Sequence, residues 1–170
     1  MNPIRYHDDV EVPVENEAEI SQRIVERMAA TQAENADRHR HAHRDAHAKS
    51  HAIITGQLTV HDDLPHELAQ GIFATPGTHE VVARLSSAPG DIHSDEIPAP
   101  RGFALKIIGV EGERLSPDLG GANQDFLMVN FPTLAFGTVT KYEDMLDILE
   151  KNASNPAAAQ KAVSAAARGI

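Results

Sequence analysis

The sequence predicts an α+β protein in which helical segments flank four antiparallel β-strands. Apolar side chains recur at helical spacing near the N-terminus, and the middle of the 170-residue chain is rich in β-branched and alternating apolar segments. Helix-forming segments return after the fourth of these. The expected order is an extended arm, a helix, four strands and two further helices, which leaves two sheet edges to be covered or paired.

The first part of the chain is expected to form an arm and one helix. Residues 1–14 contain two prolines and mixed charges without a regular period, which indicates an extended arm. From residue 15 to about residue 45 the sequence is polar and helix-forming. Its apolar positions form a narrow stripe that would pack against another element rather than build a core, and they are Ile20, Ile24, Val25 and Met28.

Four segments in the middle of the chain have the composition of strands. Turn-rich sequence separates them, and the spacings are too long for tight hairpins alone, so the connections should carry loops or short helices. In the third segment, apolar side chains alternate onto one face. The expected strands are residues 52–60, 79–86, 102–110 and 125–131.

Two helices are expected after the strands. Thr140 has the side chain of an N-cap, and Glu143 stands three positions later, as in a capping box. Residues 152–156 break this first helix, and an Ala-rich segment at residues 157–168 forms the second.

Composition excludes several classes of function. With 15 Lys and Arg against 25 Asp and Glu, the formal net charge is −10, which disfavours binding to nucleic acid or an anionic membrane. The chain has no cysteine, so disulfides and thiolate chemistry are excluded. No apolar run approaches the roughly 18 residues of a membrane span, and no secretory signal is present. We therefore expect a soluble, cytoplasmic protein.

Histidines concentrate just before the first expected strand. The chain has ten, of which four are spaced by four and would form one row on a helix; these are His39, His43, His47 and His51. Two neutral imidazoles at this spacing can chelate zinc, copper or nickel, so the local inference is a metal site. A solvated, basic helix face is the plainer alternative.

Three segments in a fixed order resemble the N-terminal half of the haem catalase family. Residues 44–49 read R-D-A-H-A-K, residues 84–87 read R-L-S-S, and residues 98–106 read P-A-P-R-G-F-A-L-K. A small-residue loop with an Asn at residues 120–123 precedes the fourth strand and is a further match. The resemblance spans roughly residues 36–150, and the scarcity of aromatic residues is more typical of the small catalase-related haem proteins.

The resemblance implies a domain organisation, a cofactor and a reaction. Residues 1–35 would be the arm and helix, residues 36–137 half of a catalase-like β-barrel, and residues 138–170 the helices of a truncated C-terminal part. The cofactor would be haem b, and the activity that of a peroxidase or catalase acting on hydrogen peroxide or organic hydroperoxides. Family members commonly oligomerise through the N-terminal arm, so a homo-oligomer is expected.

The resemblance also implies the catalytic residues. His47 would be the acid and base that moves a proton between the two oxygens of a peroxide. Ser86 would hydrogen-bond the other ring nitrogen of His47 and fix its tautomer. Asn123 would be the amide that orients the peroxide, although an ungapped alignment puts Ala122 there instead.

Cofactor-binding residues follow in the same way. Arg44 and Arg84 match arginines that pair with haem propionates. Phe131 or Phe136 could supply the ring that stacks on the porphyrin, with core packing as the alternative. Gly102 is expected to be architectural instead, since a glycine lets another part of the chain approach closely.

The proximal haem ligand of the family is missing from this sequence. The family binds iron through a tyrosinate in an R-x-x-x-Y motif, and neither Tyr6 nor Tyr142 has an arginine four residues earlier. We therefore expect the N-terminal portion of a longer protein, with a split enzyme or a haem-free remnant as alternatives. The competing functional class is a non-catalytic module that binds metal through the histidine cluster or pairs its open strand edges with another chain.

Overall fold

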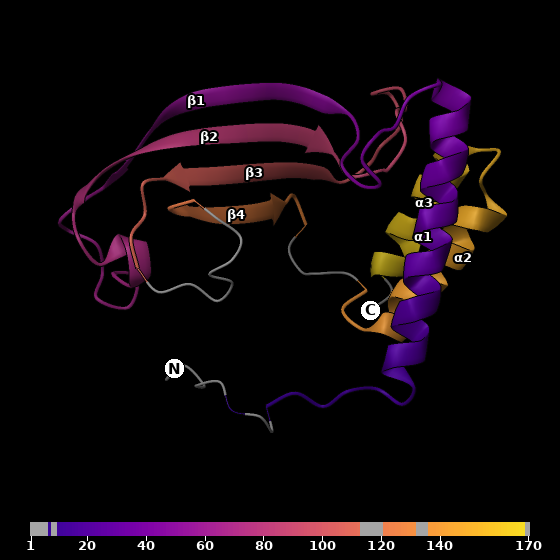
Figure 1. Cartoon of the computed structure of the whole chain (residues 1–170), viewed down its shortest axis with the longest axis horizontal. Coiled ribbons are helices and arrows are strands. Elements are labelled where there is room, and N and C mark those ends of the chain that lie inside the picture. The colour runs from indigo at the N-terminus through magenta and orange to yellow at the C-terminus, as the bar shows by residue number, and fades with distance from the viewer. Residues whose placement is uncertain (1–6, 8–9, 113–120, 132–135, 169–170) are drawn as a thin grey trace. The chain divides into compact units, whose positions relative to one another are not determined.

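A computed structural model describes residues 7, 10–112, 121–131 and 136–168 of the chain. It is a mixed α+β structure, as the sequence predicts, with an antiparallel sheet that is open (Figure 1). A closed barrel is therefore not formed within the described ranges. The elements in chain order are α1 (Glu17–His39), β1 (Ser50–Val60), the short 3-10 helix η1 (Gly71–Phe73), β2 (Gly77–Ser87), β3 (Arg101–Ile108), β4 (Asn123–Val129), α2 (Val139–Lys151) and α3 (Pro156–Arg168).

The four strands pair in sequence order, each antiparallel to the next (Figure 1). The register places Ser86 of β2 opposite Gly102 of β3, and Gly102 opposite Val129 of β4. A bulge between Ser50 and Ala52 interrupts the pairing of β1 with β2. The start of β3 thus lies beside the ends of β2 and β4, and this end of the sheet carries the residues discussed below.

The sheet has two chemically different faces, because successive side chains of a strand point to opposite sides. The core face carries apolar rows, of which one is Ala83, Leu105 and Phe126. Ile107 on this face is fully buried, and Phe73 of η1 packs against Phe126 with ring centroids 6.0 Å apart. The opposite face, here called the His47 face, carries the rows Ser86–Gly102–Val129 and Ile53–Arg84–Ala104–Leu127.

The chain separates into two compact units. One contains the three helices and consists of residues 1–45, 93–98 and 132–170; the other is the sheet, with residues 46–92 and 99–131. The helices before and after the strands therefore belong to the same unit, although far apart in sequence. No helix within the described residues is both long enough and apolar enough to span a membrane.

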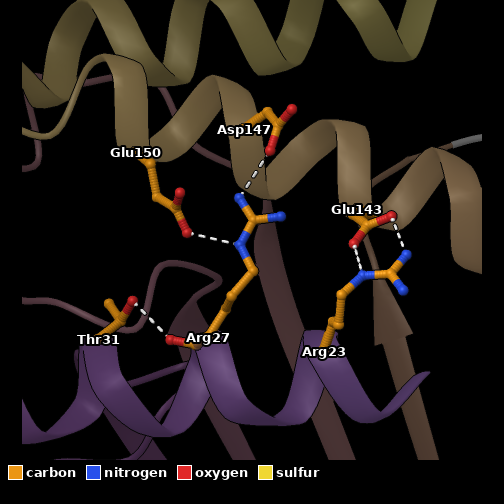
Figure 2. A network of polar contacts seen from close by, with 6 residues as sticks. All are labelled: Arg23, Arg27, Thr31, Glu143, Asp147 and Glu150. Carbon is orange, nitrogen blue, oxygen red and sulfur yellow. Dashed lines mark hydrogen bonds and ion pairs between the residues drawn. The ribbon is translucent and has the colours of Figure 1, made fainter. Parts of the chain in front are cut away.

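Ion pairs connect α1 to α2 within the helical unit (Figure 2). Arg23 binds both carboxylate oxygens of Glu143, at 2.9 and 3.1 Å. Arg27 reaches Glu150 at 2.8 Å and Asp147 at 2.7 Å. These five side chains are spaced by one turn on each helix, so they hold α1 and α2 in a defined register.

Helix α1 is shorter than the sequence suggested. It ends at His39, and Arg40 takes a left-handed backbone conformation with φ of 61°. A left-handed residue stops the helical ladder, so the histidines spaced by four do not continue along its face. His51 lies in β1. His39, His43, His47 and His51 therefore do not form one row on a helix.

The N-cap of α2 also differs from expectation. Thr138 caps the helix, its hydroxyl accepting a hydrogen bond from the backbone N–H of Lys141 at 3.3 Å, whereas Thr140 lies inside the first turn. Glu143 does not close a capping box, because the residue three positions after the Thr138 cap is Lys141. The Glu143 carboxylate is instead bound by Arg23 of α1.

Candidate functional site

His47 lies in the loop before β1, and its backbone is fixed on both sides. The N–H of His47 donates to the carbonyl of Ala88 at 2.9 Å, and its carbonyl accepts from Nη2 of Arg84 at 2.7 Å. The φ angle of His47 is 52°, in a region that residues with side chains seldom occupy. Such a conformation persists only where surrounding contacts enforce it, as these two hydrogen bonds do.

The imidazole of His47 is held by Ser86 of β2. Its Nδ1 atom lies 3.0 Å from the Ser86 Oγ, and Ser86 is buried, with 3% of its surface exposed. The hydrogen bond expected between these two residues is therefore present, while its use in catalysis stays a prediction. In the predicted acid–base role, Nε2 would be the ring nitrogen that exchanges protons with a ligand.

Gly102 of β3 forms the floor beneath the imidazole. A Cβ atom at this position would lie 2.5 Å from Cε1 and 2.6 Å from Nδ1 of His47, and 3.0 Å from the Ser86 Oγ. The two separations from His47 are shorter than a Cβ atom tolerates, so a side chain here would displace the ring. The close approach predicted for this glycine is confirmed, and the neighbour it accommodates is His47.

The two arginines expected at the haem propionates have different surroundings. Arg84 is half-buried on the His47 face and binds the His47 carbonyl. Arg44 is exposed in the loop after α1 and belongs to the helical unit. Only Arg84 is therefore placed with His47 by the structure.

Asn123 lies at the far end of the sheet from His47. It is opposite Ile108 on β3, six residues along the strand from Gly102, which corresponds to about 20 Å. Ala122, the alternative, precedes it, and its carbonyl accepts from Val110 N–H at 2.9 Å. The structure does not bring either residue to the imidazole.

Asn130 is the asparagine at the His47 end of the sheet. Its N–H donates to the Arg101 carbonyl at 3.1 Å, and its Oδ1 accepts from the Arg101 N–H at 2.7 Å. The resemblance to catalase segments did not identify Asn130 as a residue of this end of the sheet. Antiparallel pairing supplies the signal that could have found it, because the end of β4 must lie beside the start of β3.

The two aromatic candidates for stacking on a porphyrin lie in different units. Phe131 is half-buried just after β4 in the sheet unit. Phe136 is half-buried in the helical unit and has a φ angle of 59°. Only Phe131 can be placed on the same unit as His47.

A second pair of histidine and serine occupies the opposite face of the same sheet end. The His51 Nε2 lies 2.7 Å from the Ser87 Oγ. Ser87 also accepts a hydrogen bond from Nη1 of Arg101, which lies 3.5 Å from the His51 Nε2. Ser86 and Ser87 are consecutive, so their side chains point to opposite faces and serve different histidines.

The remaining histidines of the cluster contact one another. The ring of His43 packs edge-on against His39 and His41, with centroids 4.7 and 4.2 Å apart. Within the described ranges, no group of three or more His, Cys, Asp or Glu side chains is arranged to hold a metal ion. The metal-site alternative thus loses the helical row on which it was based.

Tyr142 does not provide a phenolate. It lies on α2 with its hydroxyl 3.9 Å from the sulfur of Met28 on α1. Burial, together with the charge of Asp45, raises its pKa above the usual value, which favours the protonated phenol. Tyr6 is outside the described residues.

The residues that the structure brings together are His47, Ser86, Arg84 and Gly102, all on the His47 face or in the loop beside it. Comparison with protein-family models, with curated proteins and with solved structures gave no match. The likeness to catalases thus remains a resemblance of three sequence segments.

Proposed function

We propose that the sheet unit supplies the distal side of a haem site and that His47 carries out acid–base chemistry on hydrogen peroxide or an organic hydroperoxide. The observation that carries this proposal is the imidazole of His47 held by the buried Ser86 hydroxyl above Gly102. A histidine on a strained backbone, oriented by a second side chain and packed against a glycine, has the features of a positioned acid and base.

The His47 face also suits a flat apolar group. Ile53 and Leu127 are each 71% exposed at the two ends of the row that contains Arg84 and Ala104. Val129, in the neighbouring row with Gly102, is 40% exposed. Burying such side chains under a porphyrin would contribute about 25 cal/mol for each Å² removed from water.

Arg84 would hold a propionate at the edge of this surface. A guanidinium can serve more than one acceptor, so its bond to the His47 carbonyl is compatible with a second, carboxylate partner. The same side chain would then connect the cofactor edge to the backbone of the acid–base residue. The propionate contact expected for Arg44 stays a prediction, because Arg44 belongs to the helical unit and not to the sheet unit.

The fit to haem is confined to one side. The described residues contain no tyrosine in position to become an axial ligand, since Tyr142 contacts Met28 and has a raised pKa. The described residues that would hold a haem are therefore those of the His47 face, namely Arg84 and the exposed apolar side chains Ile53, Leu127 and Val129. When bound, haem would supply the redox chemistry for cleavage of the O–O bond.

His47 would move one proton during that cleavage. With Nδ1 donating to Ser86, the lone pair of Nε2 can accept the proton of one peroxide oxygen. The resulting imidazolium can return it to the other oxygen, which then leaves as water rather than hydroxide. Such proton transfer contributes about a hundredfold or more to a rate.

A haemin titration followed by visible absorption tests the proposal. We expect saturable binding at micromolar haemin, weakened several-fold in Arg84→Ala and unchanged in Lys106→Ala, a matched loss of a cation that faces Asp125 instead. Absence of saturable binding would overturn the proposal for this chain.

Peroxide turnover at equal haem occupancy then tests His47. We expect His47→Ala to lower turnover about a hundredfold, while His66→Ala, at an exposed loop position, leaves it unchanged. Equal activity in His47→Ala and the unmodified protein would refute the assignment of His47 as acid and base.

A further inference from the structure

Arg101, at the start of β3, is a half-buried cation. Within the described residues, the groups that contact its side chain carry no negative charge. In the described part of the chain, its side-chain contacts are with the Ser87 hydroxyl and with His51, at 3.5 Å from Nη1 to Nε2. Neither partner carries a carboxylate. This is unexpected in a chain with 25 acidic residues and a formal net charge of −10. Arg23, Arg27 and Lys106 each pair with a carboxylate.

The polar group formed by His51, Ser87 and Arg101 is suited to an anion. The guanidinium has five N–H donors in a planar fork that matches a carboxylate. The Ser87 hydroxyl is held between His51 and Arg101, so its orientation is already determined.

An exposed apolar row lies directly beside this polar group on the core face. Leu85, Phe103 and Met128 are opposite one another on β2, β3 and β4, two residues along the strands from Ser87 and Arg101. They are 36%, 37% and 39% exposed. Adjacent rows on one face are about 7 Å apart, so an anion at Arg101 would have this row within reach of an attached alkyl chain.

From this juxtaposition we propose a second binding site, on the face of the sheet opposite His47, for a single-chain amphiphile with a carboxylate head. The head binds Arg101, Ser87 and His51, and the alkyl tail lies along Leu85, Phe103 and Met128. Beyond this row the core face is closed, because Ala83 and Ile107 are buried. The row crosses three neighbouring strands that lie about 4.8 Å apart, and a medium-chain fatty acid has a tail that would cover it.

The site does not depend on the proposed haem chemistry. Ser86 and Ser87 point to opposite faces, so His47 and Arg101 are separated by the thickness of the sheet. A failure of haem binding would leave the carboxylate site untouched, and a failure of carboxylate binding would leave His47 in place.

Calorimetric titration of the full chain with decanoate tests the site. We expect saturable binding that is weakened about tenfold or more in Arg101→Gln, because a charge-assisted hydrogen bond to the head is lost. Lys106→Gln, which removes a cation on the other face, should change the affinity less than twofold. Methyl decanoate and acetate, which lack the charge and the tail respectively, should each bind at least tenfold more weakly.

Methyl NMR of the four methionines gives a readout of position. Decanoate should shift the Met128 methyl signal and leave that of Met28, which contacts Tyr142 on the helical unit, unchanged. This measurement uses the unmodified protein, so it remains decisive if Arg101→Gln fails to fold. Three results would each overturn the proposal: no saturable decanoate binding, an unmoved Met128 signal, or a homodimer that buries Leu85, Phe103 and Met128 and takes up no decanoate.

Discussion

The Nδ1 atom of His47 lies 3.0 Å from the Oγ atom of Ser86, although the two residues are 39 positions apart. The loop before β1 and the end of β2 are brought together by strand pairing, and Gly102 on β3 leaves room for the ring. Three segments therefore contribute to the placement of one imidazole.

Ser86→Ala should release the His47 ring. The variant removes the hydroxyl that contacts the His47 Nδ1 atom. Since this contact is buried, we expect the free energy of unfolding to fall by about 1–2 kcal/mol. Nitrogen NMR should show a mixture of imidazole tautomers in place of one. Ser50→Ala, at the exposed position opposite Ser86 on β1, is the control and should change neither quantity.

Gly102→Ala should displace the same ring by steric contact. The added methyl group would meet Cε1 and Nδ1 of His47 at 2.5 and 2.6 Å, and such overpacking costs about 1–3 kcal/mol. Gly56→Ala in β1 is the matched control, since nothing lies within 4 Å of its Cβ position. Chemical denaturation measures both variants. Equal unfolding midpoints for the two would contradict the close packing of His47 on Gly102.

Arg27→Ala should loosen the contact between α1 and α2. Arg27 binds Asp147 and Glu150, and this pairing raises its pKa above the usual value (Figure 2). The partner carboxylates are about half exposed, so we expect a loss of only about 0.5–1 kcal/mol in the free energy of unfolding. A double-mutant cycle with Glu150→Ala isolates the pair. A coupling that is absent at low salt would show that the ion pair is not formed in solution.

The contact between Arg23 and Glu143 should depend on acid pH. The Arg23 guanidinium lowers the pKa of Glu143 below its ordinary value of 4.5. A lowered pKa in the folded state contributes stability above the unfolded value, which is lost as the pH falls through the folded value. The melting temperature should therefore decline below about pH 4.5, and less steeply in Glu143→Gln.

The control for this pH dependence is Glu34→Gln, at an exposed position of α1. Its acid profile should follow that of the unmodified protein. If Glu143→Gln and Glu34→Gln give the same profile, Glu143 is not the group that titrates.

The locations of the elements could be predicted because they follow from local patterns. Alternation and β-branching placed all four strands to within about two residues at most of their ends. The errors arose where a tertiary contact or a single backbone conformation prevailed. The left-handed conformation of Arg40 ends α1 earlier than expected. The carboxylate of Glu143, which sequence spacing assigned to a capping box, is bound by Arg23.

The candidate site was predicted in part. His47 and Ser86 stand at the positions of the catalase-like segments, and their hydrogen bond is present. Asn123 was assigned from its neighbours in sequence, but antiparallel register moved it to the other end of β3 and brought Asn130 to this one. Register depends on pairing between strands, which the composition of any one strand does not specify.

By itself, the sequence determined the kinds and order of the elements, the negative charge and the absence of cysteine. Only the tertiary structure decided that Ser86 and Ser87 serve two histidines on opposite faces of the sheet. The reason is physical. Helical and strand periods are properties of neighbouring residues, whereas the partner of a side chain is set by hydrogen bonds between strands distant in sequence.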